Sequence, residues 1–231
     1  MVAKGWSLLI GACMAVALAT PFANAAVVPT APRTVTVHPT YITYPGIKVL
    51  SSLPSVKGKI FLTVDDGIVK SATTAAILKV TPSTLFPIGG EVRKNPGWFL
   101  ALSRTGRVIE DHTASHTRLA GQPLTVQTAA ICRGRDEVKA ATGVTPTLFR
   151  PPFGSYDLTT LEAGVACGMK YVVLWDVTLQ AGDLTTWGGR LKSGDIVLMH
   201  FTRTFASDFK ILKSRMAVEH LGFANLADYI Q

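Results

Sequence analysis

The sequence predicts an α/β fold with a parallel sheet, in the form of a reduced and irregular (β/α) barrel. From residue 59 onward, short apolar runs alternate with longer helix-like stretches, which is typical of parallel strands joined by helices. The chain has 231 residues, 48% of them hydrophobic, which suits one compact domain with a substantial core. The alternating part is about 175 residues long, whereas a complete eight-stranded barrel takes about 250.

Residues 1–25 have the pattern of a secretory signal peptide. Lys4 gives a positive start, an apolar run extends from Trp6 to Ala19, and Ala-Asn-Ala at residues 23–25 is a small-x-small cleavage site. The apolar run is too short to span a bilayer. We therefore expect a secreted or cell-wall-associated protein with no stable membrane span after removal of this peptide. The alternative is a lipoprotein with its lipid on Cys13.

The remaining elements follow in order along the chain. Residues 26–56 are expected to form an extended leader, because residues 26–55 contain five prolines and no regular period, and the folded domain is expected over residues 57–231. Strands are expected at residues 60–64, 84–87, 107–110, 147–149, 171–174 and 195–199. Helices are expected at residues 71–80, 96–104, 125–141, 158–166 and 207–220. Glycines stand where several of these helices would end, at Gly106, Gly143, Gly168 and Gly222.

Ionisable or metal-binding residues follow five of the expected strands. In chain order they are Asp65 with Asp66, Asp111 with His112, Arg150, Asp176 after Trp175, and His200. The C-terminal ends of parallel strands share one face of a barrel, and active sites form on that face. The sequence therefore predicts that these scattered residues build one site.

The spacing of His112 and His116, in the sequence His-Thr-Ala-Ser-His, indicates a metal. One helical turn would place both imidazoles on the same side. Two histidines on a solvated helix are the alternative, but the position after a strand favours ligands. Two imidazoles with one carboxylate form a three-ligand site with open positions, suited to catalytic zinc or another divalent metal.

The adjacent carboxylates of Asp65 and Asp66 can serve different purposes. Successive side chains diverge, so one can bind the metal while its neighbour faces the substrate. A cation and an arginine nearby would offset their mutual repulsion. The alternative for Asp65-Asp66-Gly67 is an ordinary turn at the end of a strand.

Cys132 and Cys167 remain after removal of the signal peptide. Outside the cytoplasm two cysteines can persist as a disulfide, so we expect a Cys132–Cys167 bridge, with two separate buried thiols as the alternative. The formal net charge of +8 and the pI of about 9.6 favour anionic partners, and an anionic cell wall suits a secreted protein. The basic residues are scattered without interleaved aromatics, which argues against nucleic acid.

Four motifs in the same order resemble those of the polysaccharide deacetylases of carbohydrate esterase family four, which share the NodB homology domain. The family motif Thr-Phe-Asp-Asp-Gly resembles Thr-Val-Asp-Asp-Gly at residues 63–67, and His-Ser/Thr-x-x-His resembles residues 112–116. The family motif Arg-x-Pro-Tyr resembles Arg-Pro-Pro-Phe at residues 150–153, and Leu-x-His resembles Leu-Met-His at residues 198–200. The resemblance covers roughly residues 57–231.

This resemblance implies a distorted, incomplete (β/α) barrel of about seven parallel strands. It also implies a metal-dependent hydrolase that removes N- or O-acetyl groups from a polysaccharide such as peptidoglycan, chitin or xylan, with zinc as the first choice and cobalt or nickel as others. At the matching positions it implies three metal ligands, which are Asp66, His112 and His116.

The resemblance also implies roles for the remaining motif residues. Asp65 would be the general base that activates water, with Arg150 pairing with it and tuning it. His200 would be the general acid that protonates the leaving group. Phe153, which follows Pro152, would contribute a main-chain N–H to the oxyanion. From their positions beside the expected mouth, Trp175 and Trp187 are candidates for stacking on sugar rings.

The fourth family motif, Asp-x-x-Asp-Trp, is not matched. Residues 175–183 read Trp-Asp-Val-Thr-Leu-Gln-Ala-Gly-Asp, with Thr178 about where the first aspartate would stand. Asp176 or Asp183 could orient His200 instead, and Asp176 could line the substrate groove. A histidine without a carboxylate partner is oriented less firmly. This departure leaves two further hypotheses beside an active deacetylase: an inactive or weakened relative that binds glycan or cell wall, and a metal hydrolase of a small amide.

Overall fold

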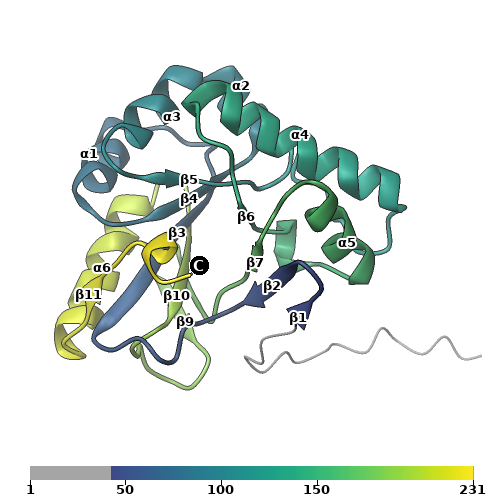
Figure 1. Ribbon diagram of the computed structural model, residues 1–231. Helices are drawn as coiled ribbons and strands as arrows, with labels where there is room; N and C mark the ends of the chain where they lie inside the picture. Colours follow the sequence, from purple (N-terminus) through teal and green to yellow (C-terminus); the bar gives the residue numbers. More distant parts are fainter. Residues whose placement is uncertain (1–42, 231) are drawn as a thin grey trace, which may run out of the picture. The chain divides into compact units, whose positions relative to one another are not determined.

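The computed structural model describes residues 43–230, and the structural statements below refer to that part of the chain. The expected signal peptide, the alternative lipid site at Cys13 and the first part of the expected leader lie outside the described residues. The ribbon is shown in Figure 1. None of the helices in residues 43–230 has the length and apolar character required to cross a bilayer.

The strands form two sheets, in which nearly all neighbours run parallel. The seven-stranded sheet has the order β5-β4-β3-β10-β8-β9, and its seventh strand, β11, pairs with β3. Its strands are β3 (Lys59–Asp66), β4 (Thr84–Pro87), β5 (Val108–Ile109), β8 (Val177–Gln180), β9 (Asp183–Thr186), β10 (Ile196–His200) and β11 (Gly222–Phe223). The four-stranded sheet has the order β1-β2-β7-β6, with β1 (Thr43–Tyr44), β2 (Ile47–Leu50), β6 (Leu148–Phe149) and β7 (Tyr171–Val173). Only the hairpins β1–β2 and β8–β9 are antiparallel among these pairs of named strands.

The two sheets meet at three places. Asp111, just after β5, forms a parallel bridge with Phe149 at the end of β6, and Ser52 forms an antiparallel bridge with Asp195. The chain also passes from β7 to β8 through residues 174–176, so two strands that are close in the sequence belong to different sheets. The expected α/β fold with parallel strands is confirmed. In the described residues, however, the ladders are interrupted between the sheets and do not form one continuous barrel wall.

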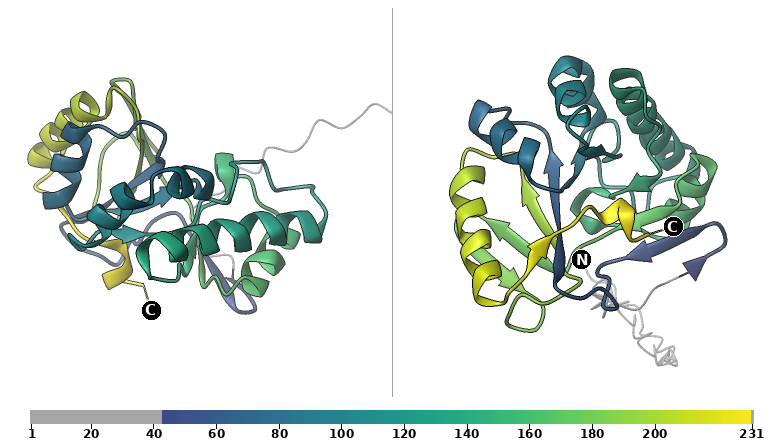
Figure 2. Two further views of the ribbon diagram at one scale, coloured as in Figure 1. Left: turned by 90° about the horizontal axis from the view of Figure 1, so that it is seen from above. Right: turned by 60° about the vertical axis from the view of Figure 1, so that its left-hand side comes forward.

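Helices cover the outside of the strands, as the right-hand view of Figure 2 shows. They are α1 (Ala72–Val80), α2 (Gly89–Lys94), α3 (Pro96–Ser103), α4 (Leu124–Thr142), α5 (Leu158–Ala166) and α6 (Phe205–Val218). Two short 3-10 helices follow β6 and β11, at Pro152–Gly154 and Leu226–Asp228. All five expected helices and all six expected strands are present, within a few residues of the expected ends. Gly143 ends α4 in the left-handed conformation that a helix C-terminus favours.

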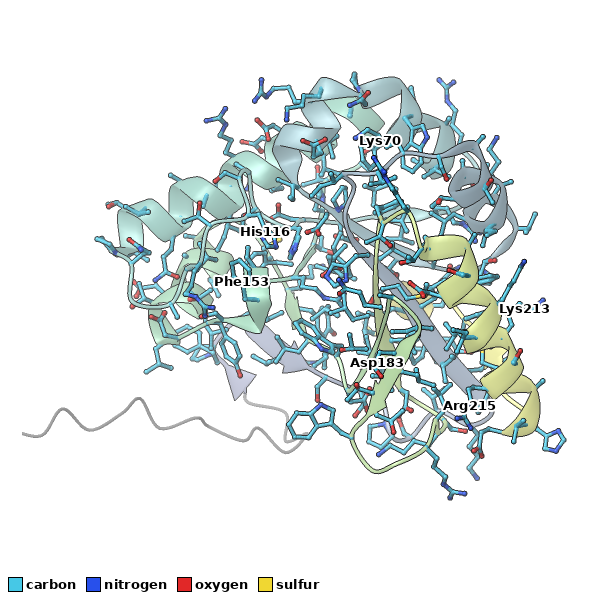
Figure 3. The ribbon with its side chains drawn as sticks, turned by 180° about the vertical axis from the view of Figure 1, so that it is seen from behind. Lys70, His116, Phe153, Asp183, Lys213 and Arg215 are labelled. Atoms are coloured by element: carbon cyan, nitrogen blue, oxygen red, sulfur yellow. A yellow bond between two sulfur atoms is a disulfide. The ribbon has the colours of Figure 1, made fainter. Side chains whose placement is uncertain are left out.

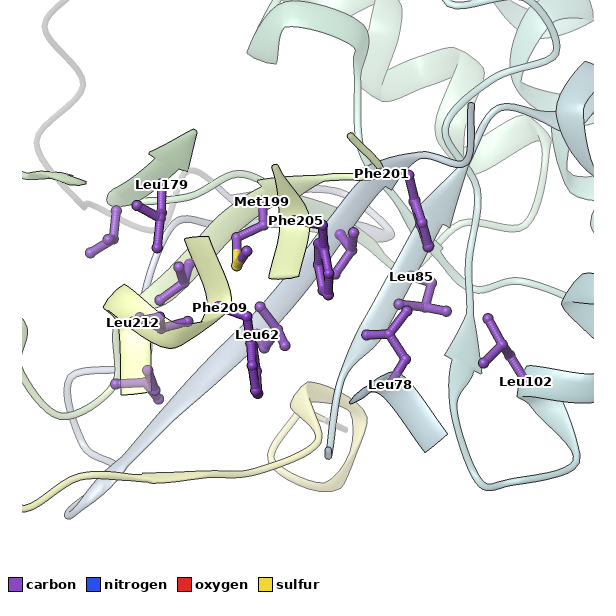
Figure 4. Packing of buried hydrophobic residues seen from close by; sticks show 14 of the residues in the cluster. Leu62, Leu78, Leu85, Leu102, Leu179, Met199, Phe201, Phe205, Phe209 and Leu212 are labelled. Carbon is purple, nitrogen blue, oxygen red and sulfur yellow. The ribbon is translucent and has the colours of Figure 1, made fainter. Parts of the chain in front are cut away.

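Alternation along β3 divides its side chains between two layers of the core. Ile60, Leu62 and Val64 belong to the cluster that packs against helices α1, α2, α3, α4 and α6. Figure 4 shows Leu62 in this layer, with Phe209 and Leu212 of α6 nearby. Phe61 points the other way, into a cluster to which both sheets contribute. Thr63 and Asp65 alternate on the side of Phe61, so β3 directs a carboxylate into the space between the sheets.

The C-terminal segment lies over the end of this interior that is opposite the C-terminal ends of the strands. β11 pairs with the start of β3 at Lys59 and Ile60. Leu226 is buried in the same interior cluster as Phe61, and the ring of Tyr229 lies 5.3 Å from that of Phe61. Figure 2 shows this segment crossing the strands. At the opposite end, β3 finishes with Asp65 and Asp66 and β10 finishes with His200.

The leader expected at residues 26–56 is partly a structural element, and the sequence interpretation missed its strand. β2 pairs in parallel with β7, and Ile47 and Val49 are buried against α5 and its neighbours. Leu50 and Leu53 enter the cluster between the sheets. Prolines at positions 45 and 54 closely flank this strand, so composition alone makes the segment resemble an irregular leader.

The expected disulfide is confirmed. Cys132 lies in α4 and Cys167 at the C-terminal end of α5, with their Cα atoms 5.0 Å apart. The bond ties together the two helices that cover the four-stranded sheet.

Candidate active site

Asp66, His112 and His116 converge at the C-terminal ends of β3 and β5. Their ligand atoms all lie within 4.8 Å of one another. The Nε2 atoms of His112 and His116 lie 3.6 and 3.5 Å from Oδ1 of Asp66. That oxygen is buried and has no hydrogen-bond partner among the described residues. A buried carboxylate oxygen facing two imidazole nitrogens fits a divalent metal held by three protein ligands.

The protonation of the two histidines also suits metal binding. Nδ1 of His112 lies 2.7 Å from the main-chain oxygen of Arg150. A carbonyl oxygen only accepts, so Nδ1 carries a proton, which in the neutral ring leaves the lone pair of Nε2 facing Asp66. Burial lowers the pKa of His116, and the neighbouring His112 lowers it further, which favours the neutral ligand form. Burial alone would raise the pKa of Asp66, but contact with His112 and the charges of the nearby histidines hold it below the ordinary value.

The histidine pair does not lie on a helix, so this expectation was wrong. Residues 112–119 form an irregular loop between β5 and α4. The side chains converge because Thr113 and His116 adopt left-handed backbone conformations, with φ of 63° and 59°. Asp66 and Phe153 are also left-handed, with φ of 76° and 61°. Such conformations cost non-glycine residues about 1–3 kcal/mol each and are typical of functional sites.

Side chains and a neighbouring helix hold this loop. The N–H of Thr113 donates to Oδ1 of Asp111 at 3.0 Å, and the N–H of His116 donates to Oγ1 of Thr113 at 3.1 Å. The N–H of Ala114 donates to the carbonyl of Ala130 in α4. A Cβ atom at Gly134 of α4 would lie 2.2 Å from Oδ1 of Asp111, so the close approach of α4 requires glycine there.

Asp65 is held by Arg150, which is fully buried. Nη1 of Arg150 donates to Oδ1 of Asp65 at 2.7 Å and to Oγ1 of Thr63 at 2.8 Å. Its other nitrogens donate to the main-chain oxygens of Val173 and Leu174. Burial lowers the pKa of Arg150, and the carboxylate of Asp65 opposes that shift. The second oxygen of Asp65 faces the candidate metal site, because Oδ2 lies 3.8 Å from Nε2 of His112.

His200 lies beside this pair but has no carboxylate partner within residues 43–230. It is opposite Asp65 in the register of β10 and β3. Nδ1 of His200 is buried and accepts or donates no hydrogen bond among the described residues. Asp176 accepts instead from the N–H of Ile196, and Asp183 is exposed on β9. Neither aspartate takes the place of the family's fourth motif.

Asp176 and Trp187 lie away from the other predicted residues. After β7 the chain leads into β8, which begins at Val177. Asp176 therefore stands just before the first residue of β8 and not at the C-terminal ends of the strands. There the N–H of Trp187 donates to the main-chain oxygen of Asp176. This places both residues at the level of Ile196, the first residue of β10, whereas His200 is its last. Trp187 is exposed, but at the end of the sheet away from His200.

The remaining aromatic candidates lie next to the site. The guanidinium of Arg150 stacks between the rings of Phe86 and Trp175, at 4.5 and 5.5 Å from their centroids. Phe153, preceded by the buried Pro152, is 59% exposed, and its ring lies 4.7 Å from that of His116. Figure 3 shows His116 and Phe153 side by side, with Asp183 well apart from them.

Several residues of the site were not recognised in the sequence. Thr63 anchors Arg150, while Thr113 and Gly134 shape the histidine loop. Thr63 belongs to the first motif and Thr113 to the second, so their positions in the motifs could have indicated a role in the site. Gly134 lies in the middle of α4, where a glycine weakens a helix, and that was the only hint of a close contact.

Comparison with known proteins identifies the family of this chain. The model described as "Polysaccharide deacetylase" matches residues 53–172, more than half of the chain. The uncharacterized protein SCO4760 of Streptomyces coelicolor is 34% identical over 180 residues, which cover 74% of this chain and 72% of the relative. The peptidoglycan-N-acetylmuramic acid deacetylase PdaC of Bacillus subtilis is 31% identical over 139 residues, which cover 58% of this chain but only 27% of that enzyme.

A solved structure shares the fold. Wild-type BA3943 of Bacillus anthracis, described as a CE4 family pseudoenzyme, superposes with a TM-score of 0.65 at 16% identity, covering 83% of this chain and 69% of that one. At this identity the likeness concerns the fold alone. The match to the family model carries the assignment: the chain belongs to the polysaccharide deacetylase family.

Proposed function

We propose that the protein is a secreted, metal-dependent deacetylase that hydrolyses N-acetyl or O-acetyl groups of a cell-wall or environmental glycan. The observation that carries the proposal is the convergence of Asp66, His112 and His116 beside the buried Asp65–Arg150 pair. Peptidoglycan is one candidate substrate, because PdaC acts on it by name. Chitin and xylan are the others. Secretion follows from the signal pattern of residues 1–25, and the basic composition suits an anionic cell wall.

The residues would divide the work as follows. Asp66, His112 and His116 would hold the metal, most often zinc, which when bound makes water nucleophilic at neutral pH and stabilises negative charge on the acetyl oxygen. Asp65 would accept a proton from the attacking water, because Arg150 fixes one of its oxygens and leaves the other facing the ligands. This fixed orientation makes proton transfer efficient.

His200 would donate a proton to the leaving nitrogen or oxygen. It pairs with Asp65 in the register of β10 and β3, so an acid and a base stand next to each other on adjacent strands, and hydrolysis of an amide uses both. The exposed ring of Phe153 would line the entrance beside His116. A main-chain N–H in the same turn would bind the oxyanion.

A second candidate function is glycan binding with little or no turnover. The observation that favours it is the buried Nδ1 of His200, which no described residue orients. A loosely oriented acid slows proton transfer to a poor leaving group. Because a pseudoenzyme shares this fold, acetate release must be measured to decide between the two candidate functions.

The test pairs metal content with acetate release. Purified protein should contain about one divalent metal and release acetate from at least one of acetylated chitin oligomers, peptidoglycan and acetylated xylan. Asp66→Ala should lose both metal and acetate release while keeping its far-UV circular dichroism. Metal retention and glycan binding by the wild type with no acetate from any substrate would favour the second candidate. A wild type with neither metal nor acetate release would refute the deacetylase proposal.

A further inference from the structure

An uncompensated positive charge lies at the rim of the site, next to a metal ligand. Arg118 follows His116 by two residues in the histidine loop and is exposed. Its guanidinium carbon lies 5.0 Å from the ring centroid of Phe153. That ring in turn lies 4.7 Å from the ring of His116. Arg118, Phe153 and His116 therefore form a continuous row leading out of the site.

The carboxylates of the surroundings are committed elsewhere. Asp65 is paired with Arg150, and Asp66 faces the two histidines. Asp157, which contacts Gly121 just after this loop, accepts N–H groups from Gly121 and Thr160 as the cap of α5. Arg118 forms no ion pair with any residue of the described part of the chain.

The conformation of Phe153 indicates that this arrangement is maintained at a cost. Its backbone has a φ of 61°, which is unfavourable for an aromatic residue, and the residue is 59% exposed. The ring face restricts the guanidinium through a cation–π contact, and this lowers the entropy lost when an anion binds. A guanidinium held in this way offers its N–H fork to a carboxylate in the bidentate geometry that lysine lacks.

From this row of contacts we infer that Arg118 makes the protein select glycans that carry a carboxylate on or next to the acetylated sugar. The inference rests on the proposed function for the position of the acetyl group at Asp66, His112 and His116. The lactyl ether of N-acetylmuramic acid and a hexuronic acid both supply such a carboxylate. Arg118 is a specificity residue in this arrangement, because it touches the substrate outside the reacting group.

The test uses matched oligosaccharides. One pair carries lactyl carboxylates or the same groups reduced to alcohols, and a second pair carries hexuronic acids or their reduced forms. The wild type should have a KM about fivefold lower for the acid form of at least one pair, the effect typical of an exposed ion pair, and the preference should shrink as salt is added. Arg118→Gln should abolish the preference, and Phe153→Leu should weaken it.

Arg190→Gln is the matched control, because Arg190 is also exposed and forms no ion pair within residues 43–230, but lies between β9 and β10 at the other end of the sheet. It should retain the full preference. Calorimetry with the deacetylated oligosaccharides measures the contribution of Arg118 to binding even if no acetate is released. The absence of acetate release would count against the deacetylase proposal but not against the role of Arg118. Equal affinity of the wild type for acid and reduced forms in both pairs, or an unchanged preference in Arg118→Gln, would overturn the inference.

Discussion

Arg150 is the residue through which the two sheets and the site are joined. It follows β6 of the four-stranded sheet, binds Asp65 and Thr63 of the seven-stranded sheet, and is fully buried. A buried ion pair contributes little net stability compared with apolar residues, but removing one partner leaves an uncompensated charge. The Asp65–Arg150 pair therefore affects stability most when one of its two partners is removed.

We predict that Arg150→Met lowers the free energy of unfolding by roughly 3–5 kcal/mol, because Asp65 remains buried without its partner. Urea denaturation measures the change. Arg93→Met is the control, since Arg93 pairs with Glu137 at the surface, where such pairs contribute about 0–1 kcal/mol. Equal effects of the two substitutions would contradict the account of Arg150. Restoration of stability by adding Asp65→Asn to Arg150→Met would support it.

Asp176 and Asp195 form a second buried acidic pair, away from the site. Burial, followed by the charge of Asp195, raises the pKa of Asp176 to about 8, and burial also raises the pKa of Asp195. The charged and polar groups that face the pair are the N–H groups of Ile196 and Lys192 and the charge of Lys192. The folded state binds the proton of Asp176 more tightly than the unfolded state does. The free energy of unfolding that this proton contributes is therefore fully present below pH 4 and is lost as the pH rises towards 8.

We predict that Asp176→Asn reduces this pH dependence. Asparagine keeps an acceptor for the N–H of Ile196 but cannot ionise, so the unfolding free energy should fall less steeply between pH 5 and 8 than in the wild type. One proton changes the slope by up to about 1.4 kcal/mol per pH unit. Glu110 and Asp111 also have raised pKa values through burial, so some slope should remain. Asp183→Asn on the exposed β9 is the control, and parallel curves for wild type and Asp176→Asn would refute the prediction.

At the scale of elements, the sequence predicted those whose pattern is local. β3 is a long apolar run that ends at two charges, and α4 is a long helix that ends at Gly143. Two of the missed elements, β2 and α2, lack such a pattern. β2 is four residues between prolines and is stabilised by β7, more than 120 positions later. α2 begins with two glycines, which lowers its intrinsic helix propensity.

The site divides in the same way. Spacing and position after strands indicated both histidines and one of the two adjacent aspartates as candidate metal ligands, and the family resemblance pointed to Asp66. Their mode of convergence does not, because left-handed backbone at Asp66, Thr113 and His116 leaves no periodic signal in the sequence. Asp176 was misplaced because the interruption between β7 and β8, which redirects that segment into the other sheet, is a consequence of tertiary pairing.

We predict that Gly134→Ala in α4 lowers metal affinity at least tenfold. The added Cβ would lie 2.2 Å from Oδ1 of Asp111 and 2.6 Å from the carbonyl carbon of Thr113, so the histidine loop must move. Overpacking of this kind costs about 1–3 kcal/mol, more than alanine's helix propensity restores. Metal titration with a chelator competitor and urea denaturation measure both effects.

Gly97→Ala in α3 is the matched control for Gly134→Ala, because a Cβ there meets no atom within 4 Å. It should leave metal affinity unchanged and raise stability slightly, by about 0.5–1 kcal/mol. Unaltered metal affinity in Gly134→Ala would show that α4 does not position the histidine loop.

At the scale of the whole molecule, the site is composed of parts that are held together by the packing of two sheets. Asp65, Asp66 and His200 come from the seven-stranded sheet, whereas Arg150 follows the four-stranded one. The loop with both histidines rests on α4, which packs on α5 over the four-stranded sheet. Any constraint that fixes α4 therefore also fixes the loop that carries His112 and His116.

The Cys132–Cys167 disulfide is such a constraint. It joins α4 to the end of α5 across a sequence separation of 35, and Cys132 lies two residues beyond Ala130, whose carbonyl accepts from the histidine loop. Closing a loop of this size restricts the unfolded chain and contributes roughly 2–4 kcal/mol. Cys132→Ala/Cys167→Ala should lose about this much stability in urea denaturation. It should also bind metal more weakly, because α4 is then free to shift against α5.

A reductant distinguishes the effect of losing the disulfide bond from the effect of losing the packing of the two sulfur atoms. It should destabilise the wild type towards the level of the double variant and leave the double variant unchanged. A double variant as stable as the oxidised wild type would mean that the apolar contacts of α4 and α5 alone keep the two helices in place. Equal metal affinity despite lower stability would instead confine the role of the disulfide to the unfolded chain, because the histidine loop would then keep its native position without it.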